Sequence, residues 1–303
     1  MSVLPRYPIY VPSAGRFETC FTAKFLIKDA VPFHHVVQPK EFDEYASRFG
    51  KERIITLPWD NDAKTRDGLL RARNWIRDHA EATGAARHWQ LDDNIREVYR
   101  RWKARKIPCT SGVAFRAVED FSDRYENVGI SGMNYYMFSR NKLKEPPFIR
   151  NAHIYSCTLV NHAMPFRWRL AYNDDTDLCL QALAGGWCTI QFLAFLVLKM
   201  RTMTVKGGNT GQLYQGDGRL RMAKALERVW PGVVTTRRRF QRPQHVIKNA
   251  WRSFDVPLRR KAGVDFEALA GTGNEYGMEL RQVKDEIESD VIRKFVEEYS
   301  GKK

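Results

Sequence analysis

Two groups of neighbouring carboxylates have the types and spacing to do chemistry. Asp92 and Asp93 directly follow the short run 87–91, and Asn94 comes next. Adjacent carboxylates repel each other, so a cation between them is expected. Mg²⁺ takes oxygen ligands, usually one or two protein carboxylates together with phosphate oxygens. One interpretation is therefore a metal–diphosphate site. The alternative is a polar turn in which Asp93 or Asn94 caps a helix that begins near Arg96.

The second group is Asp174, Asp175 and Asp177, at the start of a helix expected to run to Ala184. Acidic residues in a first helical turn can cap the helix and balance its dipole. A carboxylate there can also act as a general base. Three acids within four residues exceed what a cap needs, which favours catalysis.

The elements before Asp92 must bring these side chains together. Apolar spacing predicts strands at 7–13, 35–38, 53–57 and 88–91, separated by helices at 17–30, 42–49 and 65–81. This alternation predicts a parallel sheet with helices on both faces. Ligands of such sheets bind at the carboxyl ends of the strands. Three polar clusters fall there: 12–16, 59–61 and 92–94. Their convergence favours the metal–diphosphate site.

The later chain is expected to continue with both element types. We expect strands at 129–138, 149–160 and 187–198, the second of them possibly at a sheet edge, and helices at 95–106, 113–123, 173–184, 219–229 and 283–299. Between them, the Gly-rich stretch 206–211 predicts a flexible loop over the diphosphate, with Lys206 and Asn209 as candidate contacts. It lacks the Gly-Lys-Ser/Thr ending of a Walker A loop.

Charge and cysteine content bound the partners and the compartment. The 303 residues carry a formal net charge of +15, which favours polyanionic partners, nucleic acid before anionic membrane. The five scattered cysteines indicate a reducing compartment rather than a disulfide framework or zinc ribbon. The longest apolar run, 187–198, is shorter than the roughly 20 residues of a membrane helix. No signal-peptide pattern is visible, so we expect a cytoplasmic protein without a membrane partner.

The segment from Val233 to Lys261 is strongly basic and contains aromatic residues. Such a mixture suits phosphate contacts combined with stacking on bases by Trp251 or Phe254. The alternative is a solvated basic face with aromatic residues in the core. The candidate nucleic-acid contacts are Arg237, Arg238, Arg239, Arg242, Lys248, Trp251 and Arg252.

Four motifs together resemble a known family. They are Pro12-Ser13-x-Gly15-Arg16 after a strand, Ala72-Arg73-Asn74 in a helix, Leu91-Asp92-Asp93-Asn94 at a strand end, and the stretch from Asp174 to Trp187. Over roughly residues 7–215 the chain resembles the GT-A glycosyltransferases. It is most similar to the TET- and base-J-associated glycosyltransferases of phages and kinetoplastids, which modify hydroxymethylpyrimidines in DNA.

The resemblance implies an α/β fold of the GT-A, Rossmann-like type, with a mixed central sheet and helices on both faces. It implies a catalytic domain over residues 1–230, with a nucleotide-sugar half (1–110) and an acceptor half (111–230). The basic C-terminal region, residues 231–303, is expected to pack on this domain.

The implied reaction is a metal-dependent, inverting transfer from a UDP-sugar to the hydroxymethyl group of 5-hydroxymethylpyrimidines in DNA, in a phage-infected bacterial cell. Mn²⁺ or Mg²⁺ on Asp93 and Asp92 would bridge the donor phosphates. By position, Asp175, with Asp174 beside it, would take the acceptor proton. The implied donor contacts are Pro12, Ser13, Gly15, Arg16, Asp60, Arg73, Asn74, Asp92, Lys206 and Asn209. A duplex acceptor would have to expose or flip its base.

One position departs from the family pattern, because Asn94 stands where a further acid is usual. Asn94 could supply a neutral metal ligand or bind a sugar hydroxyl, and either of the two preceding carboxylates could hold the metal. A third ligand, often His in this fold, is missing from the Gly-rich loop, and His245 is the nearest later candidate. Three other functions stay open: the same fold with a protein or carbohydrate acceptor, an inert nucleic-acid-binding protein, and a nucleotidyltransferase.

Overall fold

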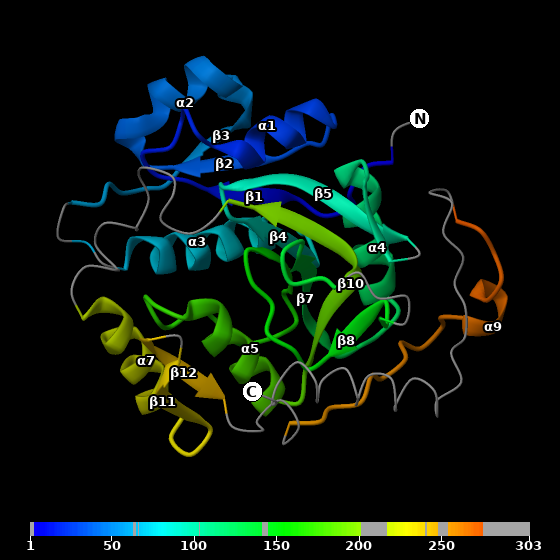
Figure 1. Cartoon of the computed structure of the whole chain (residues 1–303). Coiled ribbons are helices and arrows are strands. Elements are labelled where there is room, and N and C mark those ends of the chain that lie inside the picture. The colour runs from blue at the N-terminus through cyan, green and yellow to red at the C-terminus, as the bar shows by residue number, and fades with distance from the viewer. Residues whose placement is uncertain are drawn as a thin grey trace.

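The computed structural model describes residues 3–62, 65, 67–102, 104–140, 145–200, 217–239, 241–247 and 254–274. Within them the chain builds a mixed sheet of ten strands in the order β3-β2-β1-β4-β9-β7-β10-β5-β6, with β8 paired to β10. Helices flank this sheet (Figure 1). The expected α/β class with a mixed central sheet is confirmed.

The first part of the chain forms the parallel side of the sheet. Its elements are β1 (Ile9–Pro12), α1 (Phe21–Lys28), β2 (His34–Val37), α2 (Phe42–Phe49), β3 (Ile54–Thr56), α3 (Gly68–Ala82) and β4 (Arg87–Leu91), with one-turn 3-10 helices η1 (Pro39–Glu41) and η2 (Lys51–Arg53). β1 pairs in parallel with both β2 and β4, and β2 pairs in parallel with β3. The predicted alternation of strands and helices is therefore present.

The second part adds antiparallel strands. Its elements are β5 (Ile95–Trp102), β6 (Arg105–Pro108), α4 (Ser111–Ser122), β7 (Val128–Tyr135), β8 (Phe148–Arg150), β9 (Cys157–Asn161), α5 (Asp174–Ala184), β10 (Cys188–Lys199), α7 (Gly218–Val229), β11 (Val234–Arg239), β12 (Arg242–Ile247) and α9 (Phe266–Leu269). β9 runs antiparallel to both β4 and β7, and β10 runs parallel to β7.

The helix predicted at 95–106 is wrong, because this segment forms the hairpin of β5 and β6. β5 also pairs with β10, where Val98 lies opposite Val197. β-Branched and aromatic residues such as Ile95, Val98 and Tyr99 suit a strand. Local spacing could not reveal β10, which lies about a hundred positions further along the chain, but the neighbouring strand β6 was within local reach. Without that helix, Asp93 and Asn94 cannot serve as its cap.

The strand predicted at 149–160 is two strands, β8 and β9. Asn151 and Ser156, with φ of 53° and 64°, break the extended chain between them. β9 lies between β4 and β7 in the middle of the sheet rather than at an edge. Its five residues are buried, as a central strand requires.

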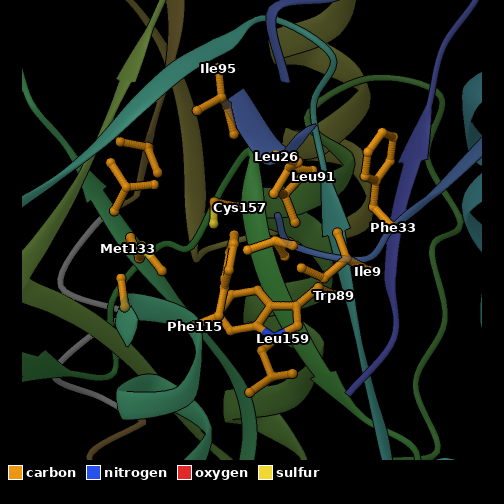
Figure 2. Packing of buried hydrophobic residues seen from close by; sticks show 14 of the residues in the cluster. Ile9, Leu26, Phe33, Trp89, Leu91, Ile95, Phe115, Met133, Cys157 and Leu159 are labelled. Carbon is orange, nitrogen blue, oxygen red and sulfur yellow. The ribbon is translucent and has the colours of Figure 1, made fainter. Parts of the chain in front are cut away.

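Two apolar layers cover the sheet. On one face, Leu26 of α1 and Phe115 of α4 join Trp89 of β4 in the largest core cluster, and the Trp89 and Phe115 rings meet edge-on 4.9 Å apart (Figure 2). On the other face, Ile76 of α3 packs with Tyr10 of β1, and Cys179 of α5 packs with Ile130 of β7.

Strand direction brings the polar strand ends to one edge. Because β9 is antiparallel to both β4 and β7, these two strands run the same way, as do β1 and β10. The residues at their carboxyl ends therefore share this edge: Ser13 after β1, Asp92 after β4, Tyr135 in β7 and Lys199 in β10. Ser156, directly before the antiparallel β9, reaches the same edge.

Several predicted features lie outside the described residues. They are Lys206, Asn209, Lys248, Trp251, Arg252 and the helix at 283–299. Among the helices that the structure does describe, none combines the length and apolar character needed to cross a membrane.

A glycine in the central sheet provides a test of the β7–β9 packing. A Cβ atom on Gly132 would overlap the backbone carbonyl oxygen of Cys157. Gly132→Ala should therefore lower the free energy of unfolding by about 1–3 kcal/mol, the usual cost of overpacking a core. Gly273→Ala is the control, because nothing lies within 4 Å of its added Cβ. Equal urea midpoints for the two variants would contradict the described packing.

Candidate functional site

Asp92 lies at the centre of a polar cluster on the carboxyl edge of the sheet. Its Oδ2 accepts hydrogen bonds from Lys199 Nζ at 2.5 Å and Ser156 Oγ at 2.7 Å. Its Oδ1 lies 3.4 Å from Arg73 Nη2. Both oxygens of this carboxylate are therefore engaged by groups from different elements.

The neighbouring charges keep Asp92 and Lys199 ionised. Burial alone would raise the pKa of Asp92, but Lys199 and Arg73 outweigh burial and lower it to about 2. Burial opposes the charge of Lys199 too and would lower its pKa, but Asp92 and Tyr135 outweigh burial and raise the pKa. The Tyr135 hydroxyl lies 3.3 Å from Lys199 Nζ, and burial raises the pKa of this phenol to about 12. At neutral pH, Asp92 and Lys199 form an ion pair beside a neutral Tyr135.

Asp93 points to a different neighbour, the loop after β1. Its Oδ1 lies 2.6 Å from Arg16 Nη1, and its Oδ2 accepts a hydrogen bond from Ser13 Oγ at 2.8 Å. The Ser13 hydroxyl also meets the Tyr45 hydroxyl of α2 at 2.7 Å. Burial raises the pKa of Asp93 despite Arg16 and Ser13. The two adjacent carboxylates thus contact separate sets of residues.

The loop from Pro12 to Arg16 is held by α2 and the short helix before it. Gly15 has a φ of 63°, a conformation that favours glycine, and its amide donates to Glu41 Oε1 at 2.5 Å. The Arg16 amide donates to the Tyr45 hydroxyl at 3.1 Å. This arrangement presents the Arg16 side chain to Asp93.

Asp60 and Asn74 lie apart from the acids. Asp60 follows β3, is exposed, and accepts a hydrogen bond from the Lys40 amide at 3.2 Å. Asn74 of α3 donates to the Trp168 carbonyl oxygen at 2.8 Å, which ties α3 to the segment that precedes α5. The donor contacts predicted for these two residues stay predictions.

Arg73 of α3 joins the two acid groups. Its side chain is only 3% exposed, and its Nε lies 2.9 Å from Asp174 Oδ2, while its Nη2 lies 3.5 Å from Asp175 Oδ1 and 3.4 Å from Asp92 Oδ1. Burial alone would lower the pKa of Arg73, but the three carboxylates outweigh it and raise the pKa. One buried guanidinium thus faces acids from two distant parts of the chain.

Asp174 and Asp175 remain partly open to solvent. Their side chains are 17% and 18% exposed. Burial, with repulsion from neighbouring acids, raises the pKa of both carboxyl groups against the opposing effect of Arg73. A raised pKa suits a group that must accept a proton near neutral pH. The third acid, Asp177, is fully buried and pairs with Arg169 at 2.9 Å and Trp230 Nε1 at 2.7 Å, so its contacts are structural.

The oxygens near Asp93 fit a hard divalent cation. Asn94 Oδ1 is buried and has no hydrogen-bond partner among the described residues. Asn94 directly follows Asp93 in the turn between β4 and β5. Within the described ranges, no three His, Cys, Asp or Glu side chains are grouped to hold a metal, so His245 does not belong to such a group. A small set of protein ligands is what Mg²⁺ uses when phosphate oxygens complete its shell.

Four of the predicted nucleic-acid contacts lie on the hairpin of β11 and β12, which packs on α5 and α7. Val234 joins Leu180 of α5 and Leu226 of α7 in one apolar cluster, and partly buried Phe254 packs against it. Phe254 therefore has the core role that the alternative interpretation gave to the aromatic residues. The arginines predicted to contact nucleic acid are exposed: Arg237, Arg238, Arg239 and Arg242.

Sequence reasoning missed Lys199, Ser156 and Tyr135 as members of the site. Lys199 ends the apolar strand β10, and a cation at the end of a buried strand was the one signal that could have revealed it. Ser156 and Tyr135 carry no local signal, because only the order of the strands brings them to Asp92.

Comparison with known proteins gives one family. A family model described as TET-associated glycosyltransferase matches residues 7–208, more than half of the chain. No curated protein matches the chain.

The Lys199–Asp92 pair predicts a specific pattern of stabilities. Lys199→Met leaves Asp92 partly unpaired, so it should lower the free energy of unfolding by up to about 3 kcal/mol. The double variant Lys199→Met/Asp92→Asn removes both charges and should lose less than the sum of the single variants. Urea unfolding of the two single variants and the double variant measures this coupling.

Lys28→Met is the control for this cycle. Lys28 lies 4.0 Å from Glu97, and both side chains are well exposed. Such pairs contribute little, so a change within about 1 kcal/mol is expected. Strict additivity in the Lys199–Asp92 cycle would contradict the ion pair.

Proposed function

The chain belongs to the TET-associated glycosyltransferase family, and from this premise we propose that it transfers a sugar from a UDP-sugar to the hydroxymethyl group of 5-hydroxymethylpyrimidines in DNA. One observation carries the proposal. Arg73 joins Asp92, at the strand end beside the proposed donor site, to a second, partly exposed acid pair suited to the acceptor.

The donor diphosphate is proposed to bind at the carboxyl edge between the Pro12–Arg16 loop and Asp93. Arg16 lies there with its guanidinium on Asp93, and a guanidinium also binds phosphate oxygens well. Asp93 and Asn94 are proposed to hold Mn²⁺ or Mg²⁺, which would stabilise the charge of the departing UDP. To bind the metal, Asp93 would exchange contacts with Arg16 or Ser13, and Asp92 could join only by exchanging its contacts with Lys199 and Arg73.

Asp175 is proposed as the general base, with Asp174 beside it. The acceptor hydroxyl oxygen attacks the anomeric carbon while Asp175 takes the hydroxyl proton. The bond from that carbon to the UDP oxygen breaks, and UDP leaves with the electron pair. Attack opposite the leaving group inverts the anomeric centre. Arg73 orients Asp175 and, by its charge, keeps the acids together.

DNA is proposed as the acceptor because the basic hairpin packs against the helix that begins with Asp174. Val234 and Thr236 face α7, where Thr236 Oγ1 donates to Glu227 Oε2 at 2.9 Å. Since side chains alternate along a strand, Arg237 and Arg239 lie on the opposite face. Arg239 is directly opposite Arg242. Like charges in such a pair destabilise a sheet, and an anionic partner would relieve the repulsion.

The base assignment predicts a loss of transfer in one variant. Asp175→Asn keeps the shape but cannot take a proton, so sugar transfer should fall by about 10²-fold or more. In the unchanged protein, the raised pKa of Asp175 means that its deprotonated form grows as pH rises, so the rate should rise with pH. The assay combines labelled UDP-sugars, Mn²⁺ and DNA containing 5-hydroxymethylcytosine or 5-hydroxymethyluracil, followed by digestion and mass spectrometry of the nucleosides.

Asp78→Asn is the matched control. Asp78 lies on α3, and its exposed side chain forms an ion pair with Arg167. This variant should transfer as well as the unchanged protein. Full activity of Asp175→Asn would refute the base assignment. The DNA acceptor would be refuted by donor hydrolysis without any sugar-bearing nucleoside, a result that would favour a protein or carbohydrate acceptor.

The hairpin predicts how DNA affinity depends on salt. Arg239→Gln/Arg242→Gln should weaken binding to unmodified DNA and reduce the slope of log affinity against log salt by up to about 2, since each phosphate contact contributes about 0.9. Arg48→Gln/Lys51→Gln removes two exposed charges from the α2 region and is the control. Fluorescence anisotropy between about 50 and 200 mM salt measures both slopes. Equal slopes for the two double variants would remove the hairpin from the DNA interface.

A further inference from the structure

An aromatic cluster beside the acids has no role in the reaction as described so far. It consists of Tyr135 at the end of β7, Phe138 in the following turn, and His153 and Tyr155 before β9. The Tyr135 and Phe138 rings stack 5.5 Å apart with an interplanar angle of 30°. The Tyr155 ring lies edge-on to Tyr135 at 4.3 Å and close to His153 at 4.7 Å.

This cluster reaches from the acids to solvent. Its inner end is the Tyr135 hydroxyl, 3.3 Å from Lys199, which holds Asp92. His153 Nε2 meets the Thr176 hydroxyl at 3.1 Å, one residue after Asp175. Its outer end is Phe138, 43% exposed. The cluster therefore borders the proposed acceptor acids and offers an aromatic side chain to solvent.

The turn that carries Phe138 is well fixed. The Tyr136 amide donates to the Val197 carbonyl oxygen of β10 at 3.0 Å, and the Phe138 amide donates to the Tyr135 carbonyl oxygen at 3.0 Å. Lys106 Nζ donates to the Tyr136 carbonyl oxygen at 2.7 Å. The fixed turn holds the Phe138 side chain in contact with water, where it contributes little to the stability of the fold. Met137 beside it is 60% exposed.

We propose that Phe138, supported by Tyr135 and Tyr155, is the platform on which a base extruded from DNA stacks while its hydroxymethyl group faces Asp175. The inference rests on the proposed DNA acceptor. A base inside a duplex cannot reach an acid at a sheet edge, so the target nucleotide must leave the stack. Aromatic side chains bind such bases by their faces, with little dependence on sequence. The platform supplies the stacking contact that the partly buried Phe254 does not offer.

The test compares three variants in the transfer assay on duplex DNA containing one 5-hydroxymethylpyrimidine. Phe138→Leu keeps an apolar side chain but loses the aromatic face, so the KM for DNA should rise about tenfold, the size expected for one lost stacking contact, while the KM for the UDP-sugar stays unchanged. Phe138→Trp should restore the KM for DNA. Ile27→Ala is the matched control, because Ile27 on α1 is also 43% exposed, and it should behave as the unchanged protein.

A second readout follows base extrusion directly. With 2-aminopurine next to the target nucleotide, the unchanged protein and Phe138→Trp should raise its fluorescence on binding, and Phe138→Leu should raise it far less. Thermal unfolding of all variants verifies the fold.

The outcomes separate this inference from the proposed function. If the unchanged protein transfers sugar to DNA and Phe138→Leu shows the same KM and the same fluorescence, the platform is refuted and the function stands. If Ile27→Ala raises the KM for DNA as much as Phe138→Leu does, the effect is unspecific and the platform is refuted as well. If the unchanged protein transfers no sugar to DNA, the proposed function fails and the platform fails with it.

Discussion

The buried guanidinium of Arg73 is the interaction on which the site depends. Four carboxylates from two parts of the chain meet at one sheet edge, and without cations their repulsion and lost hydration would oppose folding. Arg73 faces three of them, Asp92, Asp174 and Asp175, and its charge is stabilised in return. Because α3 carries Arg73, the packing of α3 on the sheet positions the guanidinium between Asp92 and the pair Asp174 and Asp175.

The remaining charges give the two adjacent acids different partners. Lys199 and Ser156 hold Asp92, whereas Arg16 and Ser13 hold Asp93. Asp93 therefore lies with the loop that we propose to bind the diphosphate, and the residue after it, Asn94, has a buried Oδ1 without a hydrogen-bond partner among the described residues. Asp92 instead serves as the link between Lys199 and Arg73. In the proposed metal site, the departure of Asn94 from the acidic pattern would have a physical reason, since a neutral oxygen would add a ligand without adding repulsion.

The basic hairpin and the aromatic cluster lie near α5, the helix that carries the proposed acceptor acids. The hairpin shares an apolar cluster with α5, and the aromatic cluster contacts Thr176 and Lys199. Long-range attraction of a polyanion and close stacking of one base are different physical tasks, and we propose that different elements perform them. Arginines on an exposed hairpin would attract phosphates at a distance, while the fixed turn at Phe138 would act only on contact.

The sequence by itself determined the parallel half of the sheet, the two acid groups and the exposed arginines. These features are local: apolar periodicity sets β1 to β4 and α1 to α3, and adjacent like charges mark a site whatever surrounds them. The hairpin of β5 and β6 is local, and only the place of β5 beside the distant strand β10 needed the tertiary structure. The tertiary structure also decided which carboxylate meets which cation. Lys199, Ser156 and Tyr135 reach Asp92 through strand order alone, and strand order arises from long-range pairing that local residue patterns do not encode.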